Sequence, residues 1–214
     1  MIDLKDVHLG DMCFVIGNGP SLSASDLDKI KEFTTFGSNY IFEMNNFLPT
    51  YYFVQDFLLL KNKQFLNKIR EVSHNTSFTF LPFNIISNKQ KKYINNVIYF
   101  YLSRPNDNSR KFSFDLSQNV EEGHTVTYTI LQFAVYMGFK KIFILGVDNT
   151  TSGHFYDADT PNEVYLQPNE VTNNSYQYLK SVLPSNVEIV NCTRGGSLEV
   201  FERMSLEQVI SNLK

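Results

Sequence analysis

The polar residues best suited to chemistry follow apolar runs of the kind that form buried strands. The first such run begins at Met12 and ends in the segment GNGPSL, which contains Gly17, Asn18, Gly19, Pro20 and Ser21. Glycines let a ligand approach the main chain, and the start of a following helix offers unpaired N–H groups with a partial positive charge. The segment lacks the third glycine of a dinucleotide fingerprint and the lysine of a Walker loop. It predicts either an anion or nucleotide site of open class, or a tight strand-to-helix turn that binds nothing.

Amides and a carboxylate follow the next apolar runs. Asn39 ends the run in FGSNYIF, and Gln55 and Asp56 end the run in YYFVQDF. Open α/β sheets bind ligands at the carboxyl ends of their strands, where an amide can donate to and accept from a base or a ribose. Asn is also a common turn residue, so a turn without a ligand is the alternative for Asn39. We expect these side chains to share one sheet edge with Asn18.

A further group lies in the segment EEGHTVTYTILQFAVYMGFKKIFILGVD. Gly123, His124, Thr125 and Thr127 mark a helix start, whose hydroxyls and N–H groups either bind a phosphate or only cap the helix. Asp148 ends the apolar run that follows this helix. Its carboxylate is suited to hold a ribose, a sugar hydroxyl, a metal ion or its own loop.

The polar stretch from Thr150 to Tyr165 carries the candidates for proton transfer. His154 is the preferred general base or acid because its ordinary pKa is near neutrality. Tyr156 and Tyr165 could donate hydrogen bonds to a leaving phosphate without a metal. A loop histidine with no catalytic role is the alternative. Arg194, beside two glycines, suits a carboxylate or phosphate of a substrate, or is a surface arginine at a turn.

The elements that must position these residues alternate between strands and helices. The expected strands are Met12–Gly17, Thr35–Asn39, Tyr51–Gln55, Val97–Tyr101, Lys141–Val147 and Val187–Asn191. The expected helices are Ser23–Glu32, Phe57–Glu71 and Thr125–Met137. This order predicts an α/β fold with a Rossmann-like, doubly wound and mostly parallel sheet. We expect one domain over residues 1–214, with the polar segment 149–174 as a mobile lid loop.

Composition narrows the class of protein. Of 214 residues, 43% are hydrophobic and 19% charged, which is ordinary for a globular domain. The formal charge of −3 argues against binding nucleic acid through a broad basic surface. Cys13 and Cys192 lie inside apolar runs and are expected to be buried free thiols. No apolar run approaches the roughly 20 residues that span a bilayer, and the N-terminus lacks a signal-peptide layout. We therefore expect a cytoplasmic protein.

Together, these stretches resemble a known group of enzymes. GNGPSL, the asparagine of FGSNYIF and TYTILQFAVYMGFKKIFILGVD resemble bacterial lipooligosaccharide sialyltransferases. Those are single-domain, GT-A-type glycosyltransferases that use a CMP-sugar donor without a metal. The fuller set, with YYFVQDF, GHTVTYT, HFYD and NCTRGGSLEVFER, is similar to a broader domain family. That family is named for an archaeal hydroxymethylpterin diphosphokinase and includes the motility-associated-factor glycosyltransferases of flagellin. The resemblance runs from Met12 to Ile210 and is weakest around residues 60–115.

The resemblance implies a role for each matching position. The residues implied to bind the nucleotide are Gly17, Asn18, Gly19, Pro20, Ser21, Asn39, Gln55, Asp56, His124, Thr125 and Asp148. For the substrate, Thr127 belongs to the turn that the resemblance places at the donor sugar or phosphate, while Arg194 is a candidate by its residue type. In catalysis the resemblance implies Tyr156 and Tyr165, and His154 is the candidate by its residue type. One departure matters: the sialyltransferases carry a histidine after the lid, where this chain has residues 166–169 without one. Either His154 takes that role or the chemistry differs.

The expected reaction is inverting transfer of a sialic-acid-like or other CMP-activated sugar from its donor to a glycan acceptor, without a metal or other cofactor. Two alternatives stay open. One is a diphosphokinase that uses ATP and Mg²⁺, with Asp148 and Asp56 holding the metal. The other is a non-catalytic nucleotide-binding accessory module of a glycan locus. Peripheral association with the inner face of a bacterial membrane and assembly into a homo-oligomer are further expectations that the sequence leaves open.

Overall fold

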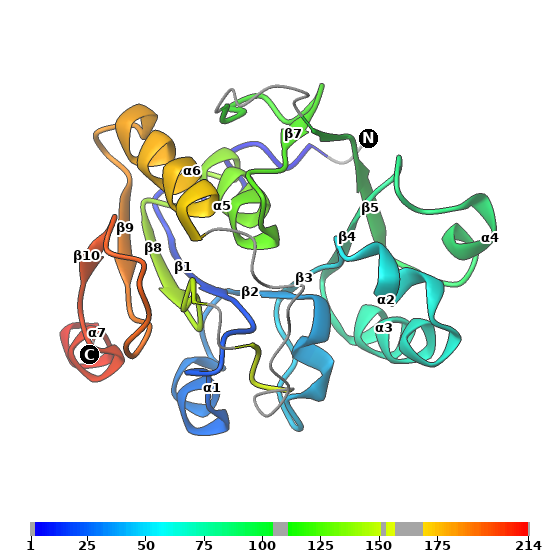
Figure 1. Ribbon diagram of the computed structural model, residues 1–214, viewed down its shortest axis with the longest axis horizontal. Coiled ribbons are helices and arrows are strands. Elements are labelled where there is room, and N and C mark those ends of the chain that lie inside the picture. Colours follow the sequence, from blue (N-terminus) through cyan, green and yellow to red (C-terminus); the bar gives the residue numbers. More distant parts are fainter. Residues whose placement is uncertain (1–2, 105–110, 151–152, 157–168, 214) are drawn as a thin grey trace.

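The computed structural model describes residues 3–104, 111–150, 153–156 and 169–213. These form one central sheet of eight strands with helices on both faces (Figure 1). Every pair of neighbouring strands in the sheet runs parallel. The predicted α/β, Rossmann-like fold is confirmed.

The strands of the central sheet are short and mostly buried. In spatial order they are β10 (Glu202–Arg203), β9 (Glu188–Asn191), β8 (Lys141–Leu145), β1 (Met12–Ile16), β2 (Thr35–Ser38), β3 (Tyr51–Phe53), β4 (Phe78–Pro82) and β5 (Val97–Phe100). A separate parallel pair is formed by β6 (Leu102–Ser103) and β7 (Val120–Glu121). All six predicted strands lie at their expected places, while β4 and β10 were not predicted.

Helices cover both faces of the sheet. On one face lie α5 (Val126–Tyr136) and α6 (Asn169–Val182), and on the other α1 (Ala24–Ile30), α2 (Phe57–Lys61), α3 (Lys63–Asn75) and α7 (Leu206–Asn212) (Figure 1). The short α4 (Asn88–Lys91) and the 3-10 helix η1 (Asn39–Glu43) complete the set. Two apolar clusters fill the two interfaces, and α5 is buried along most of its length because nearly all its residues are apolar.

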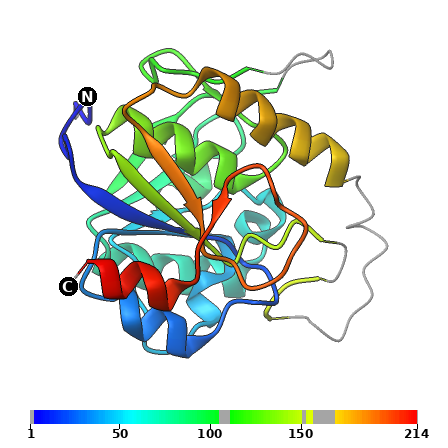
Figure 2. The ribbon, with the colours of Figure 1, turned by 90° about the vertical axis from the view of Figure 1, so that its left-hand side faces the viewer.

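The order of strands reverses beside β1. From β1 the chain proceeds outward through β2, β3, β4 and β5, whereas β8, β9 and β10 extend to the other side. Met12 pairs with Lys141 and Ile16 with Leu145, so β1 and β8 end at the same level. Figure 2 shows the arrowheads of β8 and β9 pointing the same way. Connections leave these two neighbouring ends toward opposite faces, which opens a crevice at this edge of a doubly wound sheet.

Two predictions about helices need correction. The predicted helix Phe57–Glu71 is two helices, because Asn62 is extended and its side chain caps α3 by accepting from the N–H of Gln64 at 2.9 Å. The predicted lid loop 149–174 is wrong at its end, since α6 begins at Asn169. Most of that loop, residues 151–152 and 157–168, lies outside the described part.

Two further observations concern the whole described chain. Cys13 and Cys192 are buried free thiols, as predicted. None of the described helices combines the length and the apolar character that crossing a bilayer requires.

Candidate functional site

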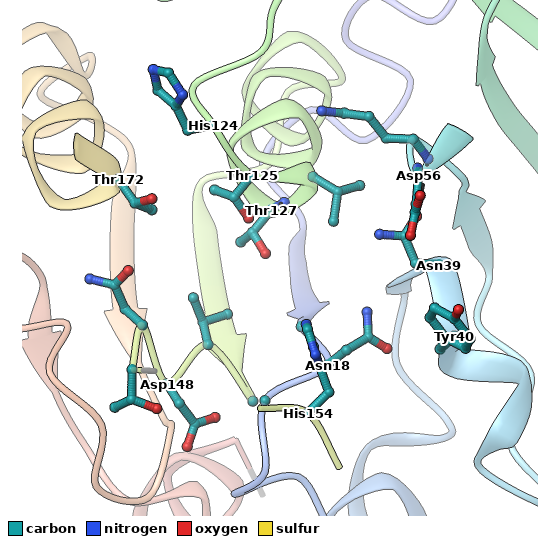
Figure 3. A pocket seen from close by; sticks show the side chains of 18 of the residues that line it. Asn18, Asn39, Tyr40, Asp56, His124, Thr125, Thr127, Asp148, His154 and Thr172 are labelled. Atoms are coloured by element: carbon teal, nitrogen blue, oxygen red, sulfur yellow. Dashed lines mark hydrogen bonds between the residues drawn. The ribbon is translucent and has the colours of Figure 1, made fainter. Parts of the chain in front are cut away.

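A cavity of about 520 Å³ opens where the strand order reverses. Its size is within the range of small-molecule sites. The ends of β1, β2, β3 and β8, the start of α5 and the segment 153–156 line it, together with α6 (Figure 3). The structure brings twelve of the predicted site residues together here: Gly17, Asn18, Gly19, Asn39, Gln55, Asp56, His124, Thr125, Thr127, Asp148, His154 and Tyr156.

Three of the predicted site residues that the structure describes are not among those that line the cavity. Two of them, Pro20 and Ser21, follow the glycine segment, and the hydroxyl of Ser21 donates to Asp148 Oδ2 at 2.8 Å. Arg194 lies outside the cavity lining. Tyr165 falls in the part of the chain that the structure does not describe.

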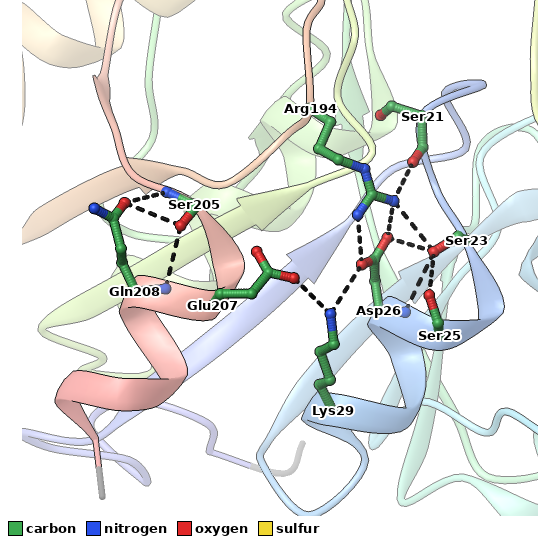
Figure 4. Close-up of polar contacts among 9 residues, drawn as sticks. All are labelled: Ser21, Ser23, Ser25, Asp26, Lys29, Arg194, Ser205, Glu207 and Gln208. Atoms are coloured by element: carbon green, nitrogen blue, oxygen red, sulfur yellow. Dashed lines mark hydrogen bonds and ion pairs between the residues drawn. The ribbon is translucent and has the colours of Figure 1, made fainter.

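Arg194 is instead paired with a buried carboxylate at the start of α1. Its Nη1 donates to Asp26 Oδ1 at 2.8 Å, and its Nη2 donates to Oδ2 (Figure 4). The Asp26 side chain is fully buried, and Ser23 also donates to it at 2.6 Å. Burial raises the pKa of Asp26, but the hydrogen bonds from Arg194 and Ser23 outweigh it and lower the pKa. The predicted substrate role of Arg194 thus gains no support, because its charge is used to anchor α1.

The glycines of the first segment make room for the neighbouring strand. A Cβ on Gly17 would lie 2.4 Å from the carbonyl oxygen of Gly146, and one on Gly19 would lie 1.8 Å from Asp148 Oδ2. The N–H groups of Gly17 and Gly19 donate to the carbonyls of Leu145 and Gly146, both at 2.8 Å. From the sequence, these glycines are expected to leave room for a ligand. In the structure, glycine is needed at both positions because the segments that follow β1 and β8 pack closely together.

The helix start that faces the cavity is that of α5. Thr125 caps this helix by accepting from the N–H of Thr127 at 3.4 Å, and both residues line the cavity. Gly123 and His124 turn the chain into α5 with φ of 55° and 66°. A Cβ on Gly123 would collide with the ring of Tyr128, so glycine is required there. The N–H groups of Thr127 and Tyr128 are bonded to the hydroxyl and the carbonyl of Thr125. Within the described residues, the start of α5 therefore presents the N–H of Val126 and the partial positive charge of the helix.

Amide side chains that follow β1, β2 and β3 line the cavity, and their hydrogen bonds leave specific atoms for a ligand. Asn18 donates through Nδ2 to the carbonyl and the hydroxyl of Ser38, at 3.1 and 3.0 Å, while its Oδ1 is buried without a partner among the described residues. Gln55 Oε1 is likewise buried and unpaired within the described chain. A buried acceptor without a donor is costly, and a ligand N–H or O–H would satisfy it.

Asn39 has a largely structural set of contacts. Its Oδ1 accepts from the N–H groups of Gln55 and Asp56, at 3.1 and 3.3 Å, which fixes the end of β3 against η1. With the oxygen engaged in this way, the Nδ2 of the same amide is directed into the cavity (Figure 3). Asn39 adopts φ 41°, a left-handed conformation that asparagine tolerates.

A stack of rings forms one wall. The Tyr156 ring lies between His154, at a centroid distance of 5.0 Å, and Tyr40, at 4.0 Å, and both pairs are nearly parallel. The N–H of Phe155 donates to the carbonyl of Asn18 at 3.0 Å, which holds this segment over the glycine turn. His154 and Asn18 therefore line the same cavity, with the His154 segment bonded to the main chain of Asn18.

The two carboxylates predicted for a metal project from opposite sides of the cavity (Figure 3). Asp148 is buried, and burial raises its pKa although the Ser21 hydroxyl partly offsets this. Asp56 caps α2 by accepting from the N–H of Leu58 at 2.8 Å. Within the described residues, no three His, Cys, Asp or Glu side chains are grouped to hold a metal ion.

Several lining residues were not predicted. Tyr40 directly follows Asn39, and Thr172 and Tyr176 come from α6, which was not predicted as a helix. Arg104 is the only Arg or Lys that lines the described cavity, and its Nε donates to Glu122 Oε1 at 2.9 Å. Tyr176 is fully buried, and burial raises the pKa of its phenol. Nothing in the spacing of Arg104 or Glu122 signals their meeting, because β6 and β7 are only two residues long.

Solved structures of glycosyltransferases share this fold. The MAf glycosyltransferase from Magnetospirillum magneticum AMB-1 matches with a TM-score of 0.63 and 18% identity, over 93% of this chain and 34% of that one. This chain therefore spans about a third of the length of that protein. The sialyltransferase CstII from Campylobacter jejuni, in complex with cytidine-5'-monophosphate, matches with a TM-score of 0.57 and 13% identity, over 92% of this chain and 86% of that one.

A second CstII structure, in complex with a trisaccharide acceptor and CMP, matches with a TM-score of 0.55 and 16% identity, over 91% of this chain and 86% of that one. Comparison with curated proteins gave no match. At these identities the structural matches establish the fold. The sequence itself matches a family described as 6-hydroxymethylpterin diphosphokinase MptE-like over residues 2–153. That match covers well over half of the chain, which therefore belongs to the 6-hydroxymethylpterin diphosphokinase MptE-like family.

Proposed function

We propose that this chain is a glycosyltransferase that moves a sugar from a CMP-activated donor to a glycan acceptor without a metal ion. The observation that carries the proposal is the convergence of three features on one cavity: the α5 start, the unpaired amide acceptors and the His154–Tyr156 stack. Likeness of fold to glycosyltransferases, one of them solved with CMP, supports the same class.

The donor nucleotide would occupy the side of the cavity formed by β1, β2 and β3. Asn18 Oδ1 and Gln55 Oε1 are acceptors, and a cytosine amino group or ribose hydroxyl supplies donors. The phosphate would face the start of α5, where the Val126 N–H, the Thr125 and Thr127 hydroxyls and the partial positive charge of the helix lie. Asp148 lies across the cavity from Asp56, away from the proposed phosphate position, so its charge would not repel the phosphate closely.

His154 would act as the base in a single displacement. Its imidazole takes the proton of the acceptor hydroxyl while the acceptor oxygen bonds to the anomeric carbon of the sugar. The bond from that carbon to the phosphate oxygen breaks, and CMP leaves with the electron pair. Donors at the start of α5 and the Tyr156 hydroxyl, already oriented by the ring stack, would stabilise the negative charge on the leaving phosphate.

The family description favours a second candidate, a Mg²⁺-dependent diphosphokinase that would use Asp56 and Asp148. The separation of these carboxylates across the cavity favours the glycosyltransferase over it. Metal dependence distinguishes the two reactions, because the diphosphokinase needs Mg²⁺ to neutralise its triphosphate.

The test is a transfer assay with CMP-activated sugars and glycan acceptors, run with EDTA and with added Mg²⁺. We expect CMP release in EDTA, and a loss of about 100-fold or more in the His154→Ala variant with CMP affinity retained. His74→Gln, an exposed histidine on α3, is the matched control and should keep full activity. Pyrophosphate transfer that requires Mg²⁺ would support the diphosphokinase. Tight CMP binding without turnover would support the non-catalytic module.

A further inference from the structure

An exposed aromatic and basic surface lies beside the cavity on the same edge of the sheet. Phe83 and Tyr101 directly follow β4 and β5, and because all the strands are parallel they lie at the edge where Asn18 and Asn39 lie. Phe83, Tyr99 and Tyr101 are 44%, 38% and 46% exposed. With Lys91 they form what we call the aromatic platform, near α4 and at the opposite end of the sheet from β10 (Figure 1).

The rings of the platform are arranged as a continuous group. The centroids of Phe83 and Tyr101 lie 5.5 Å apart. Lys91 Nζ lies 5.9 Å from the Phe83 centroid and 5.6 Å from that of Tyr99. The alternation of side chains along β5 explains why Tyr99 and Tyr101 are exposed. Ile98 and Phe100 pack in the apolar cluster that contains α5, so Tyr99 and Tyr101 point to the other face of the sheet. Monomeric proteins seldom expose several large rings together without a ligand or partner.

The charge around the platform indicates the chemistry of that ligand. Residues 72–103 contain Lys89, Lys91 and Lys92 and no Asp or Glu, in a chain whose net charge is −3. The next basic residue, Arg104, is paired with Glu122. Aromatic faces carry partial negative charge that attracts the C–H groups of a sugar ring, while a lysine beside them attracts a carboxylate. Rings and an amine together fit an acidic glycan better than a neutral one.

Two exposed or charged residues of the cavity lining come from elements close in sequence or fold to the platform. Phe57, the first residue of α2, is 42% exposed and lines the cavity. The helix α2 lies on the same face of the sheet as α4, near which the platform lies. Arg104, three residues after Tyr101, also lines the cavity. A glycan chain whose end enters the cavity would thus have its preceding sugars directed along this edge.

We propose that the aromatic platform is a second glycan-binding site, which holds the distal sugars of an acidic acceptor chain while its end is in the cavity. The proposal rests on the proposed glycosyltransferase function for its acceptor. It concerns a surface separate from the nucleotide residues, and it can be measured without turnover.

The test measures binding of oligouronates prepared from alginate, with maltooligosaccharides of equal length as neutral probes. Ligand-observed NMR titration suits the weak affinities expected of stacked sugars. We expect the wild-type chain to prefer long oligouronates to short ones and to neutral probes. The variant Phe83→Ala/Tyr101→Ala should bind them about tenfold more weakly or worse, and Lys91→Gln should lose the preference for acidic probes. CMP affinity and thermal stability should remain at the wild-type level in both variants.

Phe114→Ala is the matched control, because Phe114 is also 46% exposed but packs against Phe112 outside the platform. It should bind oligouronates like the wild type. The proposal is overturned if the wild type binds no oligouronate or if the double variant binds as well as the wild type. It is also overturned if the double substitution abolishes binding to phosphatidylglycerol vesicles or dissociates a dimer while leaving glycan binding intact. If oligouronates bind at the platform but CMP-sugars are never consumed, the proposed function fails separately.

Discussion

Replacing Arg194 with alanine should destabilise the fold and leave nucleotide binding intact. The side chain of Asp26 is fully buried. It accepts two hydrogen bonds from the Arg194 guanidinium and one from the Ser23 hydroxyl. The variant would leave a buried carboxylate without its opposite charge. Lys29 lies 3.9 Å from Asp26 Oδ1 and would replace that charge only in part.

The size of the effect follows from the geometry of the pair. Removing one partner of a buried ion pair costs about 3–5 kcal/mol. Arg194 is 55% exposed, so solvent screens part of its charge. The expected loss in the free energy of unfolding is therefore at or below the lower end of that range, about 2–3 kcal/mol. For a chain of this size, each kcal/mol shifts the melting temperature by about 2–4 °C. The expected fall in melting temperature is therefore roughly 4–12 °C.

The assay combines thermal unfolding with calorimetric titration of CMP. Arg70→Ala is the control, because Arg70 is exposed on α3 and has no ion pair among the described residues. Adding Asp26→Asn to Arg194→Ala should recover part of the lost stability, because the buried charge is then gone. An unchanged melting temperature together with a loss of CMP or donor affinity would refute the reasoning. That result would restore Arg194 to the substrate site.

Three further outcomes follow from the packing and the pKa values. Gly19→Ala should destabilise the protein and weaken CMP binding, because the new Cβ would overlap Asp148 Oδ2, and wild-type melting and affinity would contradict this. Asp26→Asn should be less stable than wild type at neutral pH. Since the pKa of Asp26 is lowered in the folded state, its stabilisation is complete above the unfolded value of about 4 and is lost as the pH falls through the folded pKa. The stability gap measured by urea unfolding should thus shrink below pH ~4, and a constant gap would disprove the pairing. Burial raises the pKa of Cys192 to about 12, so a thiol reagent should modify Cys192 only after unfolding; fast labelling of the native chain would show the thiol to be accessible.

The positions of Asn18, Asn39, Gln55 and Asp148 were predictable because each of these residues follows a buried apolar run. In a parallel sheet, the residue after such a run must lie at the carboxyl edge, whatever the details of packing. That rule places Asn18, Asn39, Gln55 and Asp148 around one cavity. It requires only the strand pattern and the alternation of strands with helices.

Roles that depend on long-range partners could not be predicted in this way. Arg194 meets Asp26 across 168 residues of sequence, and no local pattern announces that pair. Similarly, Gly19 and Asp148 lie far apart in the chain, so their contact is visible only in the fold.

The strand β4 and the helix α6 were not predicted because local sequence preferences there oppose the observed structure. The run of β4 ends in Pro82, and a proline argues against a central strand, yet here it occupies the last position. The helix α6 contains three Asn residues and one Thr, which have low helix propensity, but Tyr176 and Leu179 are buried in the apolar cluster that contains α5. Packing of that narrow apolar face overrides the local preference.

The most direct test of the central claim is the crystal structure of this chain soaked with CMP. We predict the nucleotide in the cavity, with its base or ribose hydrogen-bonded to Asn18 Oδ1 or Gln55 Oε1 and its phosphate at the start of α5. Well-ordered CMP bound elsewhere on the surface, or a cavity that stays free of nucleotide at saturating CMP, would contradict the account.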